Sequence, residues 1–564
     1  MKIPKVPFDV NAAANVKKLP HGNNWPVVYI INNDNEAYIG ETVDVSQRTS
    51  QHYMNNARRV LKEIHVISDD DFNKSVILDL ESFLIKYMAA DGKFKLQNNN
   101  HGLIDHNYYN REVYENNFNN IWNELKREGL AVNSLKEIEN SDMFKYSPYK
   151  ALSSEQAEAL TEILQMVLDD INSGTESTML VEGGAGTGKT VLAVFMMKLF
   201  SEIGDTIPAD DPDEVNAIDN LAEEIGNLKV GLVLPQTTLQ KTVGDVFEKV
   251  DGLSRDMVLA PTKLLENINY PEEKYDILIV DEAHRLNQRK ALISYPAYDK
   301  MNKALGLDEE GTALDWVIKC SKRQVLFYDP MQAVHPADIN EQYIRDTINS
   351  RIFRKCILTS EMRCEGGYDY IEYVKQILSD DPPLEKKSFG DAYDLRFYED
   401  VNQMIADIKE RDQEFGLCRN VAGYAWPWKT KSNHGGGLYD MEFDGHKYRW
   451  NSTYKDWINA PDSVNEIGCI HTIQGYDLNY AGVIFGSEIH YNKNTGRIEA
   501  IYDNYYDKRG RIGMKNDPRH LRKFIINIYM TLMTRGIKGT YVYVCDDALR
   551  EYMKSFFDVV IKKK

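Results

Sequence analysis

The sequence predicts an α/β protein in which a small N-terminal α/β domain precedes two larger lobes built on parallel sheets. Residues 20–110 contain two β-rich runs around a polar turn, followed by two amphipathic helical patterns. From about residue 150 onward, apolar runs of strand length are followed by helical patterns, an order typical of parallel sheets. Several of these runs end in polar or charged residues, where such sheets bind their ligands.

The length and composition indicate a multidomain protein of the cytoplasm. The 564 residues suggest about three to four domains. The sequence has no apolar run long enough to span a membrane and no secretory signal peptide. None of its six cysteines forms a C-x-x-C pair, so we expect reduced thiols and no structural zinc site.

The net charge of −19 argues against a nucleic-acid partner, but the charge is unevenly distributed. Residues 201–227 hold nine carboxylates and no lysine or arginine. We expect a solvated surface insertion there, with an acidic regulatory element as the alternative. Residues 508–523 hold seven basic side chains against one aspartate. This segment is either a basic face that binds phosphates or an exposed loop.

The N-terminal segment begins with a predicted β-hairpin over residues 27–40, in which two β-rich runs flank an Asn-Asn-Asp-Asn turn. Residues 41–53 predict a helix that follows the hairpin. Arg48 and His52 lie four residues apart in it, so the helix presents both on one face.

A second helix, predicted over residues 75–89, carries Glu81, and an asparagine-rich stretch follows it. This order resembles the GIY-YIG endonucleases over roughly ninety residues. The matching positions are Val28-Tyr29, Tyr38-Ile39-Gly40, the helix arginine Arg48, the metal-binding glutamate Glu81, and one of Asn98 to Asn100, of which we favour Asn99.

The resemblance implies hydrolysis of a phosphodiester bond with one divalent metal. Glu81 would hold Mg²⁺ or Mn²⁺, and Arg48 would neutralise the phosphate. Tyr29, Tyr38 or His52 would orient or deprotonate water. The first glycine of the family motif is replaced by a valine, and the hairpin turn is short. The alternative is a domain that kept the scaffold and lost the chemistry.

Residues 111–149 predict a helix and a linker, with Trp122 and Leu125 as a packing face. A Ser-Pro-Tyr sequence at the end of this segment breaks the helical pattern and marks a domain boundary. We therefore divide the rest of the chain into a first lobe, residues 150–345, and a second lobe, residues 346–564.

The first lobe contains the sequence G-x-x-x-x-G-K-T between an apolar run and a helical pattern, which is the context of a P-loop. Glycines let backbone N–H groups turn toward phosphate oxygens, and the helix N-terminus adds positive charge. Lys189 would reach the β- and γ-phosphates of ATP, and Thr190 would offer its hydroxyl to Mg²⁺. The alternative is a glycine-rich turn with a stray lysine. The predicted phosphate-binding residues are Gly183, Gly184, Ala185, Gly186, Thr187, Gly188, Lys189 and Thr190.

Residues 275–285 predict a buried strand that ends in two carboxylates, Asp281 and Glu282. Adjacent acids at a strand end repel each other unless a cation is present. We therefore expect Asp281 to hold Mg²⁺ through water and Glu282 to activate the attacking water.

Further motifs resemble those of superfamily 1 helicases and imply two RecA-like lobes with ATP between them. A glutamine that precedes the P-loop reads adenine in that family, which makes Gln156 the candidate here. Asp329 and Gln332 match the motif that senses the γ-phosphate. The resemblance assigns Arg363 and Arg535 as arginines that reach this phosphate, a role suited to their charged fork.

Two more stretches resemble helicase motifs that involve nucleic acid. Residues 229–238 look like the motif that touches its backbone. Residues 470–477, which include Gln474 and Asp477, look like the motif that links nucleotide and nucleic acid. At its end, Tyr476 and Asp477 stand where Leu and Glu are expected, and the shorter carboxylate can still serve.

The second lobe extends the match beyond general helicase motifs. From about residue 150 to the C-terminus the chain resembles the bacterial Schlafen-type helicase-like family. Trp426 and Trp428 could stack bases, but the flanking apolar strand favours a place in the core. The stretches that carry this resemblance are residues 421–428, Trp450-Asn451 and residues 467–474.

These expectations combine into an ATP-dependent nuclease. A nucleic-acid motor would deliver substrate to, or license, the metal-dependent N-terminal nuclease, with DNA favoured over RNA as partner and a homo-oligomer left open. By analogy alone, such a fusion suggests defence against phage. Two alternatives remain: an ATP-gated switch without translocation, and a nucleic-acid sensor whose nuclease is inactive.

Overall fold

The structure, a computed structural model, divides into two compact units. The first comprises Met1–Ile171, Val194–Leu228 and Val243–Met257, and the second comprises Asn172–Ala193, Lys229–Thr242 and Val258–Lys564. The predicted α/β class is confirmed: the first unit contains a small mixed sheet and the second contains two parallel sheets. The described residues are 3–98, 111–148, 152–202, 228–250, 252–292, 294–339, 341–349, 352–359, 364–431, 437–453, 456–473 and 475–560.

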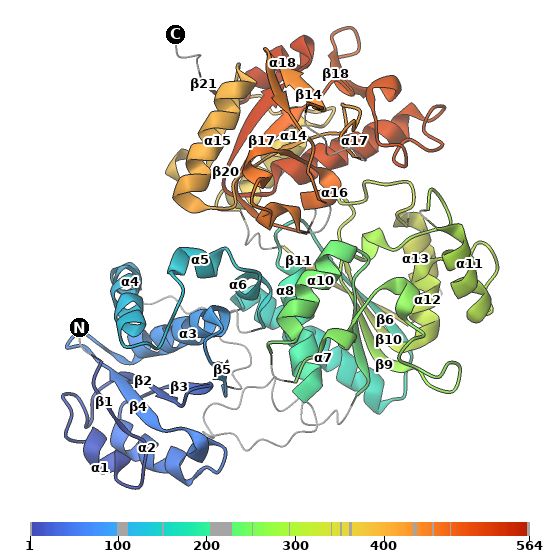
Figure 1. The fold of residues 1–564 in the computed structure, drawn as a ribbon. Helices are drawn as coiled ribbons and strands as arrows, with labels where there is room; N and C mark the ends of the chain where they lie inside the picture. The colour runs from blue at the N-terminus through green and yellow to red at the C-terminus, as the bar shows by residue number, and fades with distance from the viewer. Residues whose placement is uncertain are drawn as a thin grey trace. The chain divides into compact units, whose positions relative to one another are not determined.

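The N-terminal sheet is built from β1 (Lys5–Pro7), β2 (Val27–Asn32), β3 (Glu36–Thr42), β4 (Glu63–Ile67) and β5 (Lys95–Leu96). Its strand order is β1-β4-β2-β3-β5 (Figure 1). β2 pairs antiparallel with both β3 and β4, so the predicted hairpin is confirmed. Because β1 joins this sheet, the domain starts before residue 20, where we had expected it to begin.

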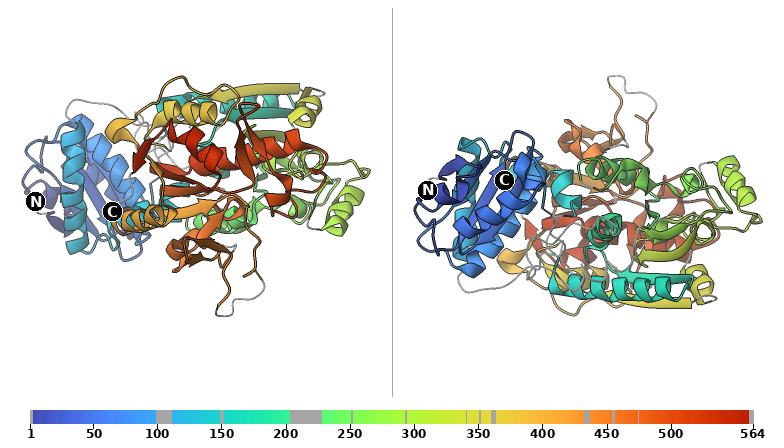
Figure 2. Two further views of the ribbon diagram at one scale, coloured as in Figure 1. Left: turned by 90° about the horizontal axis from the view of Figure 1, so that it is seen from above. Right: turned by 90° about the horizontal axis from the view of Figure 1, so that it is seen from below.

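Both predicted N-terminal helices form, because polar side chains cap their free N–H groups. Asp44 accepts a hydrogen bond from the Gln47 amide at 3.0 Å, and Asn73 accepts one from the Val76 amide at 3.1 Å. The helices of this part, drawn in blue and cyan in Figures 1 and 2, are α1 (Ala12–Val16), α2 (Val45–Met54), α3 (Lys74–Asp91), α4 (Arg111–Arg127), α5 (Leu135–Glu139), α6 (Asp142–Tyr146) and α7 (Ser154–Asn172).

The α4 helix buries Trp122 and Leu125, as expected of a packing face. The indole Nε1 of Trp122 donates a hydrogen bond to the Asn133 carbonyl at 3.0 Å, so its polar atom is satisfied.

The first parallel sheet has the strand order β11-β6-β10-β9-β7-β8, and every neighbouring pair is parallel. Its core contains Trp316, Tyr298 and Leu314. The strands are β6 (Ser177–Gly183), β7 (Val230–Val233), β8 (Val258–Leu259), β9 (Tyr275–Val280), β10 (Ser321–Tyr328) and β11 (Ile352–Leu358). The connecting helices are α8 (Lys189–Glu202), α10 (Thr237–Phe247), α11 (Tyr295–Ala304), α12 (Ala313–Cys320) and α13 (Glu341–Asn349).

One strand corrects the predicted lobe boundary at residues 345 and 346. β11 pairs in parallel with β6, so it belongs to the first sheet, not to the second lobe. Its sequence carries no signal of this pairing, because a strand's neighbours depend on the whole topology.

The second parallel sheet has the order β16-β13-β17-β20-β12-β21. From β12 to β13 the chain crosses the sheet in one direction through α15 (Val401–Phe415). From β17 to β20 it moves in the opposite direction through α17 (Pro518–Met533). Right-handed crossovers therefore place these two helices on opposite faces, as Figure 1 shows. The strands are β12 (Asp394–Tyr398), β13 (Arg419–Ala422), β16 (Ile467–Cys469), β17 (Leu478–Phe485), β20 (Gly536–Val544) and β21 (Asp558–Val560), and the helices are α14 (Gly367–Ile377), α15 (Val401–Phe415), α16 (Ile470–Ile473), α17 (Pro518–Met533) and α18 (Asp547–Lys554).

Two antiparallel hairpins project from the second lobe: β14 (Met441–Phe443) with β15 (His446–Tyr448), and β18 (Ile489–Asn492) with β19 (Arg497–Ala500). Trp426 and Trp428 are partly buried and pack against the core, in agreement with the expectation. Trp426 meets the fully buried Trp450 edge-on, with ring centroids 6.2 Å apart.

We expect Gly40→Ala to loosen the N-terminal sheet. A Cβ atom at this position would lie 2.3 Å from the Tyr29 hydroxyl oxygen and 2.5 Å from its ring, so the ring must shift, at a cost of about 1–3 kcal/mol. Hydrogen exchange in β2 and β3 should accelerate. Gly92→Asn is the matched control, because a Cβ atom at this left-handed residue (φ 69°) would meet no atom within 4 Å and asparagine tolerates that conformation. Unchanged exchange in the Gly40→Ala protein would contradict the expectation.

Candidate functional site

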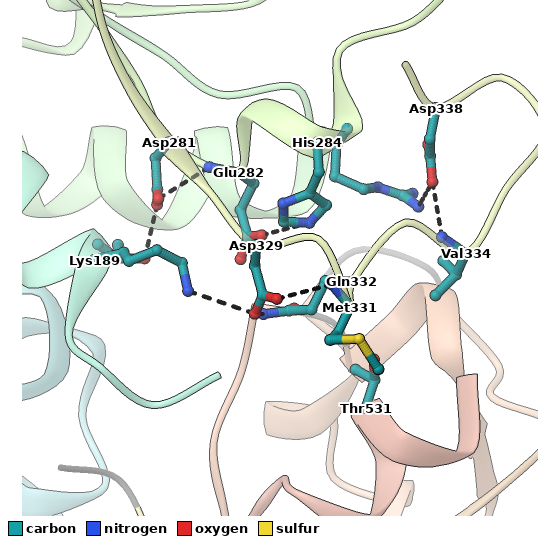
Figure 3. Close-up of polar contacts among 12 residues, drawn as sticks. Lys189, Asp281, Glu282, His284, Asp329, Met331, Gln332, Val334, Asp338 and Thr531 are labelled. Carbon is teal, nitrogen blue, oxygen red and sulfur yellow. Dashed lines mark hydrogen bonds and ion pairs between the residues drawn. The ribbon is translucent and has the colours of Figure 1, made fainter. Parts of the chain in front are cut away.

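Three neighbouring strands of the first parallel sheet end at one polar cluster. The P-loop follows β6, Asp329 follows β10, and Asp281 and Glu282 follow β9. The strands are adjacent in the order β6-β10-β9 and parallel, so their carboxyl ends meet at one edge of the sheet. Figure 3 shows the side chains of Lys189, Asp281, Glu282 and Asp329 converging there.

The P-loop folds around the ammonium of its own lysine. The Lys189 Nζ donates to the carbonyls of Gly183 at 2.8 Å and Gly184 at 2.5 Å, and lies 3.6 Å from Asp329 Oδ2. Gly186 and Gly188 adopt φ angles of 83° and 80°, which favour glycine. The α8 helix begins at Lys189, so its N-terminus adds positive charge. A buried ammonium at a helix start suits the phosphates of a nucleotide.

The two predicted Mg²⁺ ligands of the ATP site are in contact. The Thr190 hydroxyl donates to Asp281 Oδ2 at 2.7 Å. Burial and the neighbouring charge of Glu282 raise the pKa of Asp281 to about 6. A hydroxyl and a carboxylate are oxygen donors of the kind that Mg²⁺ prefers. The residues therefore fit this ion, and a cation would favour the ionised form of Asp281.

Glu282 has an unusual backbone and a close partner. Its φ of 54° and ψ of 46° are left-handed, which is uncommon for a residue with a side chain. Burial would raise its pKa, but the imidazole of His284, at 2.8 Å, together with Lys189 and Arg535, lowers it well below the usual value. Glu282 is therefore an anion at neutral pH. Figure 3 shows the pair with His284.

A continuous contact path leads from the P-loop lysine to the second lobe. Asp329 accepts a hydrogen bond from Gln332 Nε2 at 2.7 Å (Figure 3). Gln332 Oε1 accepts one from Arg535 Nη2 at 3.1 Å, and Arg535 Nη1 donates to the Tyr476 carbonyl at 3.3 Å. Arg535 is only 1% exposed. The structure thus brings together Lys189, the segment that carries Asp329 and Gln332, and Arg535, which the sequence predicted as three separate motifs.

The remaining residues predicted to bind the nucleotide are Gln156, Asp477, Arg363 and Gln474. Gln156 accepts a hydrogen bond from the Ser153 amide at 3.1 Å, and the Ser153 hydroxyl accepts from the Gln156 amide at 3.2 Å. This reciprocal cap explains its burial at the start of α7. Asp477 is half-buried next to β17. Arg363 and Gln474 lie outside the described residues.

The five predicted nuclease residues form one cluster in the N-terminal domain. Tyr29 Oη lies 2.7 Å from His52 Nε2, and the rings of Tyr38 and His52 are 4.7 Å apart. Burial and the nearby Tyr38 raise the pKa of Tyr29 well above its usual value, Arg48 opposes this by charge and by a hydrogen bond, and Glu81 adds to it. All five side chains are buried.

Two neighbours complete this cluster. The guanidinium carbon of Arg58 lies 3.7 Å from the centre of the Tyr38 ring. Asn98 clamps the backbone of Ile39, because its Nδ2 donates to the carbonyl at 2.7 Å and its Oδ1 accepts from the amide at 3.0 Å. Asn98 thus has a structural role, and the favoured Asn99 lies outside the described residues. Arg58 was not predicted from the sequence, since its position after α2 carries no periodic signal.

A further acidic residue, which the sequence does not single out, supports the segment that carries Asp329 and Gln332. Asp338 accepts hydrogen bonds from the amides of Val334 and His335, each at 2.9 Å, and pairs with Arg285 at 3.0 Å (Figure 3). This carboxylate ties the segment after Gln332 to the turn after Glu282. A lone aspartate in a loop gives no sequence signal for such contacts.

Within the described part of the chain, no cluster of three or more histidine, cysteine, aspartate or glutamate side chains is arranged to hold a metal ion. The same residues include no helix with the length and apolar character needed to cross a membrane.

Comparison with known proteins identifies the large C-terminal part. The chain is 26% identical over 435 residues to an uncharacterized protein of Saccharomyces cerevisiae, covering 71% of this chain and 90% of the yeast protein. Among solved structures, a Pif1 helicase from Bacteroides in complex with ADP-AlF3 and ssDNA is 15% identical, with 69% of this chain and 92% of that chain covered and a TM-score of 0.26. An arterivirus nonstructural protein 10 helicase is 12% identical with a TM-score of 0.27, and this chain spans 69% of its own length and 64% of the viral chain.

A family profile described as "Schlafen group 3, DNA/RNA helicase domain" matches residues 176–546. This range covers more than half of the chain and includes the first parallel sheet and every strand of the second except β21. The predicted Schlafen-type helicase resemblance is confirmed: the protein belongs to the Schlafen group 3 family, through its DNA/RNA helicase domain.

Proposed function

We propose that the protein is an ATP-dependent nuclease. A nucleic-acid motor in the second unit would deliver substrate to, or license, a metal-dependent nuclease in the N-terminal domain. The observation that carries the motor is the path from Lys189 through Asp329 and Gln332 to Arg535. One ion pair and two hydrogen bonds separate the phosphate-binding ammonium from the second lobe, so a change at the phosphates alters contacts there.

Each residue of the ATP site has a defined task in this proposal. Lys189 exchanges its loop carbonyls for phosphate oxygens. Thr190 and Asp281 provide the ligands for Mg²⁺, which supplies charge neutralisation when bound. Glu282, kept anionic by His284, accepts a hydrogen bond from the attacking water and orients it.

The nuclease proposal rests on the cluster around Tyr29. A phenol with a raised pKa stays protonated, so Tyr29 would position His52 and not act as a base. Tyr38, or His52 in the tautomer that donates from Nε2 to Tyr29 and leaves Nδ1 free, would activate water. Arg48 would bind the scissile phosphate, and Glu81 would hold Mg²⁺ or Mn²⁺. The presence of all five groups in one buried cluster favours an active enzyme over a nucleic-acid sensor.

DNA is the favoured substrate, and defence against phage is the proposed role, on the analogy of a nuclease fused to a motor. The same contact path would serve an ATP-gated switch that opens the nuclease without translocation. Strand displacement driven by ATP distinguishes the motor from the switch.

Glu282→Gln should bind ATP and hydrolyse it roughly 10²–10⁴-fold more slowly, because glutamine keeps the shape and loses the charge that orients water. Phosphate release and binding of a fluorescent ATP analogue measure the two effects. Lys189→Ala provides the contrast, since it removes the charge that binds the phosphates and should weaken both binding and turnover. A Glu282→Gln protein that no longer binds ATP would assign this residue to the structure or to the metal.

Arg535→Ala should lower ATP hydrolysis by roughly 10³-fold or more, since arginines of this kind act on the transition state. ATP affinity should change little. Arg497→Ala is the matched control, because this arginine is exposed on β19. Equal losses of affinity and rate would place Arg535 in ground-state binding instead.

Glu81→Gln should abolish cleavage and leave ATP hydrolysis intact, because an amide has nearly the volume of a carboxylate but not its charge for the metal. Cleavage of short single- and double-stranded DNA and RNA with Mg²⁺ or Mn²⁺ tests this, with Asp71→Asn as an exposed control in the same domain. Lys189→Ala should also reduce cleavage if ATP licenses the nuclease. Full cleavage by the Glu81→Gln protein would refute the assignment of the nuclease site.

A further inference from the structure

The basic segment of the second lobe forms a turn-rich loop between β19 and α17. Its base is fixed at two points on the lobe. The Tyr506 amide donates to the Tyr424 carbonyl at 2.7 Å, and Asp507 Oδ2 lies 2.9 Å from His471 Nε2. The buried Tyr505 anchors the same end. The loop is therefore held in place at its root, while five of the seven basic side chains of the segment are exposed.

Six cations make up what we call the basic loop surface. Five come from the loop and the start of α17, and all five are exposed. The sixth comes from the first lobe: its Cε lies 4.0 Å from where a Cβ of Gly513 would be. The surface thus includes side chains from both lobes of the second unit. Its members are Lys508, Arg509, Lys515, Arg519, Lys523 and Lys290.

These cations differ from the other basic residues of the same segment. Arg522 is bonded to Asp380 at 2.5 Å, and Arg511 lies over the Tyr502 ring at 4.7 Å. The one acidic side chain of the segment, Asp517, is paired with His520 at 2.6 Å. In contrast, no side-chain carboxylate of the described residues lies within ion-pair distance of the six cations.

The absence of nearby counter-charges leaves six cations together in a protein with 86 acidic and 67 basic side chains. Some other lysines of the second unit are paired, as Lys322 is with Asp276 and Lys538 is with Glu365, each at 2.8 Å. Like charges kept together without counter-charges are costly unless a polyanion binds. A nucleic-acid backbone, with its regularly spaced phosphates, is such a ligand.

The exposed apolar groups beside the cations indicate which class of polyanion fits this surface. Tyr506 is 38% exposed at the root of the loop, so its ring is available to stack on an unpaired base. A membrane would need several large apolar side chains, and Ile512 is the one other such residue exposed within residues 502–523. Cations for the backbone and one aromatic ring for a base fit a single-stranded nucleic acid.

We propose that the basic loop surface binds the phosphate backbone of single-stranded nucleic acid and that Tyr506 stacks on one of its bases. This inference rests on the proposed motor function and adds the surface that would bind the nucleic-acid strand along which the motor moves. Because the surface joins cations from both lobes, a bound strand would contact both lobes at once.

The test replaces four loop cations together, Lys508→Gln, Arg509→Gln, Lys515→Gln and Arg519→Gln, in the full chain. A control removes the same charge from exposed lysines elsewhere in the second unit: Lys300, Lys303, Lys447 and Lys493. Binding of labelled single-stranded DNA and RNA is followed by fluorescence anisotropy over a range of salt concentrations. ATP hydrolysis without nucleic acid is measured in parallel and should be unchanged.

The loop variant should lose at least about tenfold in affinity at low salt, and its slope of log K against log salt should fall by about 0.7 for each lost phosphate contact. Tyr506→Leu should weaken binding without changing the slope, because stacking releases no counterions. If the loop variant kept the wild-type affinity and slope, or if the control lost as much affinity as the loop variant, this inference would be wrong. The motor proposal would not be affected. A wild-type protein that binds neither DNA nor RNA would overturn the motor proposal as well.

Discussion

The buried ammonium of Lys189 is the charge on which the arrangement of the nucleotide site depends. A charge removed from water must be surrounded by oxygen atoms, and here two loop carbonyls and Asp329 provide them. Asp329 is in turn held by Gln332. The parallel sheet makes this possible, because three adjacent strands deliver the loop and the acids to the same edge.

In the N-terminal cluster, too, buried polar groups are placed next to groups that can bind them. Tyr29 is buried under the glycine of β3 and can keep its hydroxyl there because His52 lies within hydrogen-bonding distance. Arg48 and Glu81 bring opposite charges to the same place. Buried polar groups of this kind are costly unless they are mutually satisfied, so the close packing that fixes the sheet also fixes the positions of these side chains.

Local patterns in the sequence were sufficient for the P-loop, the strand that ends in Asp281 and Glu282, and the N-terminal hairpin, since each depends on neighbouring residues. Contacts between distant segments were not predictable. Arg58 reaches Tyr38 from a turn without periodicity, and β11 joins the first sheet through a pairing set by the whole topology. The contact of Arg535 with Gln332 could not be predicted either, because it joins residues of the two lobes.

The position of β11 has a mechanical consequence. Leu358, at its end, pairs with Gly183, the first glycine of the P-loop. Every later strand of the described chain belongs to the second sheet or to one of the two hairpins. The chain therefore leaves the first sheet one strand spacing, roughly 4.8 Å, from the P-loop. A rotation of the second lobe about the end of β11 would have a short lever arm at the P-loop and a long one at the distant parts of that lobe, so a small displacement beside the loop would correspond to a larger one far from it.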